Sequence, residues 1–224
     1  MLKPRKKITK RQIKEDPLVT YYFKTLDFMK QHSQKITIGI IVVLVVIFIA
    51  VLMAKSKQSA ELDASEQLVK ANIQLSNQQT QDAINILLSL VDNYNGTKNA
   101  AKGVYLLGKA YYQKGEYDKA QIYFEKYIDD YGDDPILASG AYTGLGASLE
   151  QQGKYFEAAN YYEKGAKKYP DNFNAPQQLM DAGRCYTRAN QISRAKECYQ
   201  LVVDKYGDSG LKNDAELYLA KLNG

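Results

Sequence analysis

The side chains that could do chemistry are few in this chain of 224 residues. Catalysis needs groups that transfer protons, attack a substrate or hold a metal. The chain has one histidine, His32, which stands in a lysine-rich stretch. No glycine-rich phosphate loop, nucleophile elbow or metal-spaced cluster of His and Cys occurs in the sequence. We therefore expect a protein that is not an enzyme and that uses no cofactor and no metal.

Two pairs of residues still deserve a chemical interpretation. Cys185 and Cys198 are the only cysteines, and they form a disulfide if the domain is exported and their α-carbons approach to within about 7 Å. The alternative is that both are small, buried apolar side chains with free thiols. Asp133 and Asp134 precede a proline, and we interpret them as solvated turn residues rather than metal ligands.

Apolar residues recur with a helical period over the last two-thirds of the chain. Val104, Leu107 and Tyr111 lie three or four positions apart, which is typical of one face of an α-helix. Four alanines are each followed eleven residues later by a tyrosine, at intervals of 37, 38 and 37 residues: Ala83/Tyr94, Ala120/Tyr131, Ala158/Tyr169 and Ala195/Tyr206. A fixed period of this size predicts stacked units that bury a core only against their neighbours.

Turn-forming residues divide each period into two helices. The first helix ends at a residue suited to the left-handed backbone of a tight reversal: Gln78, Gly115, Gly153 or Asn190. The second helix ends at the repeated tyrosine. Where the two helices cross closely, only small side chains fit, and the first helices carry such residues at one position each: Ala71, Gly108, Gly146 and Gly183.

These residues resemble the tetratricopeptide repeat. The second unit carries Leu107-Gly108, Tyr111, Ala120 and Phe124, and the third and fourth units carry equivalent residues. The resemblance implies an α-solenoid in which each unit is a helical hairpin. It covers residues 64–222, with units at about 64–97, 101–134, 139–172 and 176–209, and with a capping helix at 211–222.

An uncharged apolar run precedes the repeats. Fourteen of the nineteen residues 36–54 are Ile, Val, Leu or Phe, and as a helix this run spans about 28 Å, close to a hydrocarbon core of about 30 Å. We expect a transmembrane helix here, with residues 55–63 as a linker or the start of the first repeat helix. A cleaved signal peptide is the alternative, but the leader is long and no small-x-small site precedes Lys55. The expected fold is therefore all-α, with a single N-terminal transmembrane helix, about four helical hairpins and a C-terminal cap.

Charge is distributed unevenly about this run. Residues 1–35 hold ten Lys or Arg and three acidic residues, whereas residues 55–224 hold twenty basic and twenty-two acidic residues. The positive-inside rule places residues 1–35 in the cytoplasm and the repeats on the other side. Nucleic-acid binding by the basic arm is a second interpretation, which we do not favour because topology explains the charge. A juxtamembrane amphipathic helix is expected to open at Asp16-Pro17 and to lie at the membrane interface.

In tetratricopeptide proteins the binding groove is lined by exposed positions of the first helices. The resemblance therefore implies a groove for extended peptides, in which aromatic residues supply contact area and cations hold carbonyl or acidic groups. The alternative is that this surface is solvated and binds no specific ligand. The groove positions are Tyr105, Lys109, Tyr112 and Gln113 in the second unit, Thr143, Ala147, Glu150 and Gln151 in the third, and Met180, Arg184, Thr187 and Arg188 in the fourth.

The layout of a basic segment, one span beginning Ile38-Gly39-Ile40 and helical repeats resembles the bacterial inner-membrane YfgM-like proteins. These are ancillary subunits of the SecYEG translocon that also meet periplasmic chaperones. The repeats resemble envelope tetratricopeptide proteins of cell-division coordination and outer-membrane assembly. The resemblance implies a scaffold with periplasmic repeats that binds translocon, chaperone or envelope proteins, and neither nucleic acid nor a small-molecule substrate. The alternative is a membrane-anchored receptor or adaptor with its repeats in the cytosol.

Overall fold

A computed structural model of the chain describes residues 17–223, and every regular element in that range is an α-helix. The basic arm over residues 1–16 lies outside the described residues. The chain divides into two units, Met1–Lys57 and Gln58–Gly224, which are described separately. The helices are α2 (Pro17–Gln31), α3 (Ser33–Ser76), α4 (Thr80–Asn93), α5 (Lys98–Gln113), α6 (Tyr117–Asp130), α7 (Pro135–Gln151), α8 (Tyr155–Lys168), α9 (Ala175–Arg188), α10 (Ile192–Lys205) and α11 (Lys212–Asn223).

The first unit contains α2 and the apolar part of α3. Helix α2 begins at Pro17, as the Asp16-Pro17 pair predicts. By length and composition, α3 is long and apolar enough to cross a membrane, and its side chains from Ile38 to Met53 are exposed. Helix α3 continues without a break to Ser76. Residues 55–63 are therefore helical, the second of the two states expected for them.

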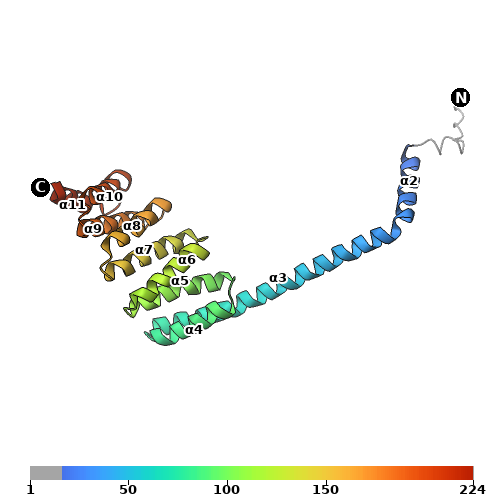
Figure 1. Ribbon diagram of the computed structural model, residues 1–224, viewed down its shortest axis with the longest axis horizontal. Coiled ribbons are helices and arrows are strands. Elements are labelled where there is room, and N and C mark those ends of the chain that lie inside the picture. Colours follow the sequence, from blue (N-terminus) through green and yellow to red (C-terminus); the bar gives the residue numbers. More distant parts are fainter. Residues whose placement is uncertain (1–16, 224) are drawn as a thin grey trace, which may run out of the picture. The chain divides into compact units, whose positions relative to one another are not determined.

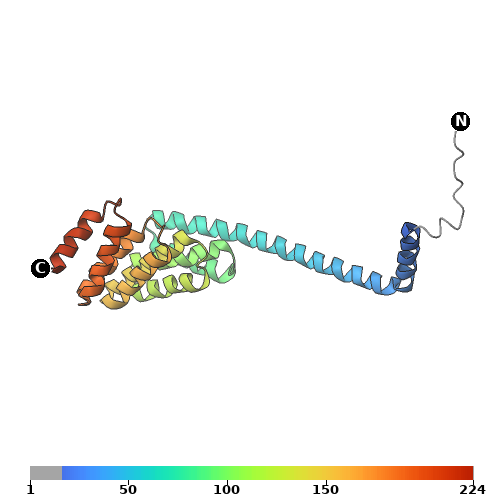
Figure 2. The same ribbon diagram turned by 90° about the horizontal axis from the view of Figure 1, so that it is seen from above.

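The second unit is a stack of helical hairpins (Figure 1). The hairpins α5/α6, α7/α8 and α9/α10 follow in sequence order, and the final part of α3 and then α4 precede them. Each helix from α4 to α10 packs against the next one along the chain, and adjacent first helices also contact each other. Figure 2 shows α11 at the C-terminal end of the stack, where it packs on α10. The all-α solenoid and its C-terminal cap are confirmed.

The turn inside each hairpin uses the left-handed backbone that the sequence predicts. The φ angles are 62° at Gln78, 76° at Gly115, 76° at Gly153 and 56° at Asn190. This conformation lets the chain reverse within about three residues, so that the second helix lies against the first. Two of the four positions hold residues with a side chain, which makes those turns less favourable than the glycine turns.

The helices of each hairpin cross at the small residues. A Cβ added to Gly108 would lie 2.8 Å from the ring of Phe124, and one added to Gly183 would lie 2.6 Å from the ring of Tyr199. Gly146 stands in the same relation to Tyr162, at 2.8 Å. The predicted role of these glycines is confirmed, and the four repeat alanines opposite them are fully buried: Ala83, Ala120, Ala158 and Ala195.

The repeated tyrosines end the second helices and also join neighbouring hairpins. Tyr131 follows the last residue of α6, and its hydroxyl donates to Oδ1 of Asn95 in the preceding inter-repeat turn at 3.0 Å. Tyr206 repeats the arrangement two stack positions later, donating to the carbonyl of Pro170 at 2.9 Å. Each bond joins residues 36 positions apart, close to the repeat period of 37 or 38 residues, so each bond connects two successive repeats.

The first helices begin earlier than the repeat pattern predicts. Helix α5 begins at residue 98 rather than 101, and α7 begins at residue 135 rather than 139. N-caps explain both starts: Thr97 accepts from the amide of Ala100, and Asp134 accepts from two amides of α7. Glu61 on α3 further caps α5, accepting from the amides of residues 98 and 99 at 2.9 and 3.1 Å.

Candidate functional site

The predicted groove positions fall on one side of the first helices, but they differ widely in exposure. Lys109, Gln113, Gln151 and Arg188 are exposed, whereas the remaining positions are partly or fully buried. The exposed residues offer their polar atoms most directly to solvent. The predicted surface is therefore narrower than the sequence pattern suggests.

Tyr105 is half-buried and belongs to the packing between α5 and α7. Its ring makes edge contacts with Phe124 and Tyr127, at centroid distances of 6.0 and 5.7 Å. A Cβ added to Gly140 of α7 would lie 2.7 Å from the Tyr105 hydroxyl. Burial raises the pKa of this phenol above its ordinary value. The Tyr105 side chain therefore packs between the first helices α5 and α7, and Gly140 leaves space for its hydroxyl.

Tyr112 and Thr187 also make contacts within the stack. The Tyr112 ring meets the edge of Tyr117 at 5.4 Å, across the turn of its own hairpin. The Thr187 hydroxyl donates to the carbonyl of Gly183 one turn earlier, at 2.8 Å. Both residues are half-buried, so their polar atoms are only partly available to a ligand.

Thr143 takes part in a buried amide network that joins α7 to α9. Gln178 is fully buried, and its Nε2 donates to the Thr143 hydroxyl and to the Ser139 carbonyl, each at 2.9 Å. Met180 is also buried, so its predicted place on an exposed groove is wrong. The reason is tertiary: α9 is covered by α7, α8 and α10, which leaves less of its surface open than the repeat register implies.

The charged groove positions pair with one another across α7 and α9. Arg184 binds the carboxylate of Glu150 with both terminal nitrogens and also contacts Asp181 at 2.9 Å. Arg188 lies 3.6 Å from the same Glu150 carboxylate and over the ring of Tyr155. The hydrogen bonds that Arg184 donates to Glu150 raise the pKa of Arg184 above its ordinary value. Two cations and two carboxylates thus neutralise each other, and the cluster links hairpins more than it offers charge to a ligand.

Cys185 and Cys198 are both buried and carry free thiols in this structure. Burial raises the pKa of each thiol to about 12. At neutral pH both are therefore protonated and unreactive. This is the arrangement of the second alternative, in which the two cysteines are small core side chains.

The described residues contain no group of three or more His, Cys, Asp or Glu that could hold a metal ion. Asp133 and Asp134 are exposed, and Asp134 caps α7 by accepting from the amides of Ile136 and Leu137 at 2.9 and 3.2 Å. Both aspartates thus belong to the turn that precedes α7.

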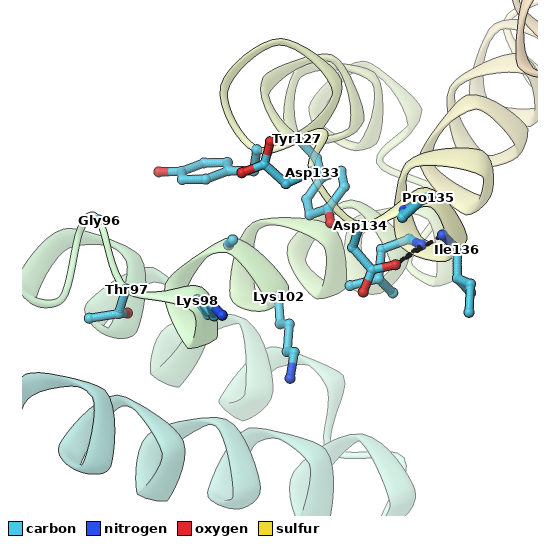
Figure 3. Close-up of a pocket in the computed structure, with 12 residues that line it drawn as sticks. Gly96, Thr97, Lys98, Lys102, Tyr127, Asp133, Asp134, Pro135 and Ile136 are labelled. Atoms are coloured by element: carbon cyan, nitrogen blue, oxygen red, sulfur yellow. Dashed lines mark hydrogen bonds between the residues drawn. The ribbon is translucent and has the colours of Figure 1, made fainter. Parts of the chain in front are cut away.

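A pocket of about 680 Å³ opens between the beginnings of α5 and α7. Figure 3 shows Lys98 and Lys102 on the α5 side and Asp134, Pro135 and Ile136 at the start of α7. The end of α6 completes the lining with Tyr127 and Tyr131. Lys98 and Lys102 precede Tyr105 and Lys109 by seven residues each, so they continue the predicted stripe toward the start of α5. The repeat pattern does not predict this pocket. It places the start of α5 three residues later, after Lys98, and so leaves out part of the lining.

A family model described as a tetratricopeptide repeat-like domain matches residues 27–223. The chain belongs to the tetratricopeptide repeat-like family. This fold is typically a scaffold that binds proteins or peptides rather than a catalyst. No curated protein matches the chain significantly.

Solved structures show the same repeat architecture. The chain is similar to the MamA RS-1 ArsTM double mutant, with a TM-score of 0.57, 19% identity, and coverage of 71% of this chain and 83% of that one. It is also similar to a Podosopora anserina putative kinesin light chain with nearly identical TPR-like repeats, with a TM-score of 0.56, 16% identity, and coverage of 70% and 84%. At these identities the similarity shows the fold alone.

Proposed function

We propose that this tetratricopeptide repeat-like protein is a non-enzymatic, membrane-tethered scaffold that binds extended segments of other proteins on the extracytoplasmic side. It lies in a bacterial inner membrane with its N-terminus in the cytoplasm and its repeats in the periplasm. There it assists protein secretion or envelope biogenesis, with translocon, chaperone or envelope proteins as partners. The order of basic segment, apolar run and repeats supports this assignment, as does the resemblance to the YfgM-like layout.

The observation that carries the binding function is a set of exposed polar residues, together with a pocket, on the first helices of the repeats. Lys109 and Gln113 on α5, with Gln151 on α7, are exposed, and a pocket of about 680 Å³ opens further along the same face of α5. Pockets of this size, within the usual range of about 300–1,000 Å³, accommodate one or two side chains of a ligand. An extended polypeptide can lie along the helices and insert a side chain there.

Binding is tested with the full chain in detergent micelles on an array of random-sequence dodecapeptides. The expected result is reproducible binding to a subset of the peptides, with none for empty micelles. If the folded chain binds no peptide on the array, the proposed function is wrong.

The membrane side is tested by adding protease to spheroplasts that express the chain. With periplasmic repeats, the domain is digested without lysis. Digestion only after lysis would instead support the adaptor with cytosolic repeats. Intact-mass measurement of the membrane-extracted chain adds a second check, because loss of the residues up to Ala54 would show that the apolar run is a cleaved signal peptide.

A further inference from the structure

The pocket between α5 and α7 contains a phenolic hydroxyl that forms no hydrogen bond within residues 17–223. Tyr127 on α6 lines the pocket, and its side chain is 1% exposed. Within residues 17–223 its ring contacts Tyr105 and Tyr131, but no hydrogen bond is formed by its hydroxyl. This oxygen is not among the described side-chain atoms that are shut off from solvent without a partner, so it opens to the pocket, where water or a ligand can bond to it.

The hydroxyl of Tyr131, which lines the same pocket, already has a hydrogen-bond partner. Tyr131 donates to Oδ1 of Asn95 at 3.0 Å, so its hydrogen bond is used to join two hairpins. Burial, together with the charges of Asp134 and nearby groups, raises the pKa of Tyr127 to about 12. The Tyr127 hydroxyl therefore keeps its proton at neutral pH and can act as a donor.

The two lysines on the α5 wall are also without acidic partners. In the part of the chain that the structure describes, neither Lys98 nor Lys102 forms an ion pair through its ammonium group. Glu61 contacts the start of α5, but its carboxylate accepts from backbone amides of that helix. The opposite wall carries Asp133 and Asp134, and the Asp134 carboxylate caps α7. The pocket is thus positive on one side and negative on the other.

Most of the remaining lining is apolar. Ala101 of α5 and Ile136 and Leu137 of α7 lie beside the two tyrosine rings, and Ile136 is 62% exposed. A large apolar side chain placed here would cover these groups and remove their surface from water.

We propose that this pocket anchors an extended segment of a partner protein through one large apolar or aromatic side chain with a carboxylate next to it. The apolar side chain lies against Tyr127, Tyr131 and Ile136. The carboxylate lies on the α5 wall, paired with Lys98 and Lys102, and accepts the Tyr127 hydrogen bond. The acidic wall opposite disfavours segments with many acidic residues, so the site selects an apolar–acidic pair. This inference rests on the proposed function, since it assumes that the repeat domain binds polypeptide segments.

The test compares the wild-type chain, full-length and in micelles, with Tyr127→Phe and with Lys98→Gln/Lys102→Gln on the same dodecapeptide array. The wild type is expected to enrich peptides in which Phe, Tyr, Leu or Ile adjoins Asp or Glu. Tyr127→Phe weakens the strongest array peptide about tenfold, as loss of a hydrogen bond to a charged group implies. Lys98→Gln/Lys102→Gln abolishes the preference for a carboxylate over an amide.

Two matched controls accompany these variants. Tyr131→Phe removes the hydroxyl that is already bonded to Asn95, and it leaves peptide affinity within about twofold because that hydroxyl has no proton to offer a ligand. Lys196→Gln/Lys205→Gln changes the charge by the same amount on α10, away from the pocket, and leaves the preference unchanged. Melting curves measured by circular dichroism check that each variant is folded, and Tyr127→Phe alone decides the question if the lysine variant unfolds.

Four results would overturn the inference. If the chain binds peptides without the apolar–acidic enrichment, or if Tyr127→Phe and the lysine variant bind as the wild type does, the pocket is not the anchor while the proposed function stands. If no peptide binds, both are wrong. Self-association abolished by the same variants, with no peptide motif, would assign the pocket to a second copy of this chain.

Discussion

Replacing Tyr186 with phenylalanine should destabilise the repeat domain by removing one hydrogen bond from a buried carboxylate. The Tyr186 hydroxyl lies 2.6 Å from Oε2 of Glu163 and 2.8 Å from Oδ1 of Asn160, and the residue is fully buried. Arg194 donates to the same Glu163 oxygen at 2.7 Å and Lys167 to the other at 2.5 Å. The variant keeps the ring and loses only the oxygen, so packing changes little.

The magnitude follows from the charge of Glu163. Hydrogen bonds to charged groups contribute about 1.5–3 kcal/mol, more than those between neutral groups. Arg194 and Lys167 remain in place in the variant, so the carboxylate keeps part of its compensation. We expect Tyr186→Phe to lower the free energy of unfolding by about 1.5–3 kcal/mol at pH 7.

The pH dependence provides a second check. Burial opposes the charged form of Glu163, but the hydrogen bonds from Lys167 and Tyr186 and the charge of Arg194 outweigh it, so its pKa in the folded protein is lowered. A lowered pKa stabilises the fold above the unfolded value of about 4.3, and this stabilisation is lost as the pH falls through the folded pKa. The difference between wild type and Tyr186→Phe should therefore shrink from pH 7 toward pH 3.

The assay is urea unfolding of the full chain in micelles, followed by circular dichroism at both pH values. Tyr127→Phe is the matched control, because its hydroxyl has no partner in residues 17–223, and it should change stability by less than about 0.5 kcal/mol. Equal effects of the two variants at pH 7, or a Tyr186→Phe effect that does not diminish at low pH, would refute the reasoning.

Three further predictions use the same unfolding measurement or a simple labelling assay. Glu61→Ala should lower stability by about 1–2 kcal/mol, because it removes the carboxylate that caps the start of α5. Gly144→Ala should lower stability by about 1–3 kcal/mol, because the added Cβ would lie 2.3 Å from the ring of Phe124. Cys185 and Cys198 should resist N-ethylmaleimide in the folded chain and react in urea, because burial raises both thiol pKa values to about 12.

Each of these has its own control. Glu61→Gln should recover part of the loss, since its amide oxygen still accepts hydrogen bonds; identical effects of alanine and glutamine would argue against capping. Gln151→Ala, an exposed change on the same helix as Gly144, should stay within about 0.5 kcal/mol, and an equal loss there would remove the steric explanation. Rapid labelling of either cysteine under native conditions would contradict its burial.

The local features of the fold could be predicted from the sequence because they depend on neighbouring residues. The left-handed turns at Gln78 and Asn190 were expected from their place in the repeat, although neither residue is glycine. Gly108 and Gly183 were expected at helix crossings, and the rings of Phe124 and Tyr199 occupy the space they leave. Because the sequence repeats every 37 or 38 residues, successive hairpins pack a small residue against a ring in the same way.

The candidate site could be predicted only in part, because exposure depends on packing between hairpins. Met180 has the register of a groove residue but is covered by neighbouring helices. Glu150 and Arg184 were both expected to face a ligand, yet they bind each other from positions 34 residues apart. No local pattern distinguishes a charge that is available from one that is already paired.

By itself, the sequence determined the helical class, the repeat, the turns and the apolar run, since these follow from spacing, residue size and backbone preference within one or two helices. The tertiary structure decided which side chains remain available. The stack pairs Arg184 with Glu150 and Tyr131 with Asn95, while the Tyr127 hydroxyl in the pocket between α5 and α7 forms no hydrogen bond within residues 17–223. These outcomes depend on distances between successive hairpins, which are fixed only when the hairpins pack against one another.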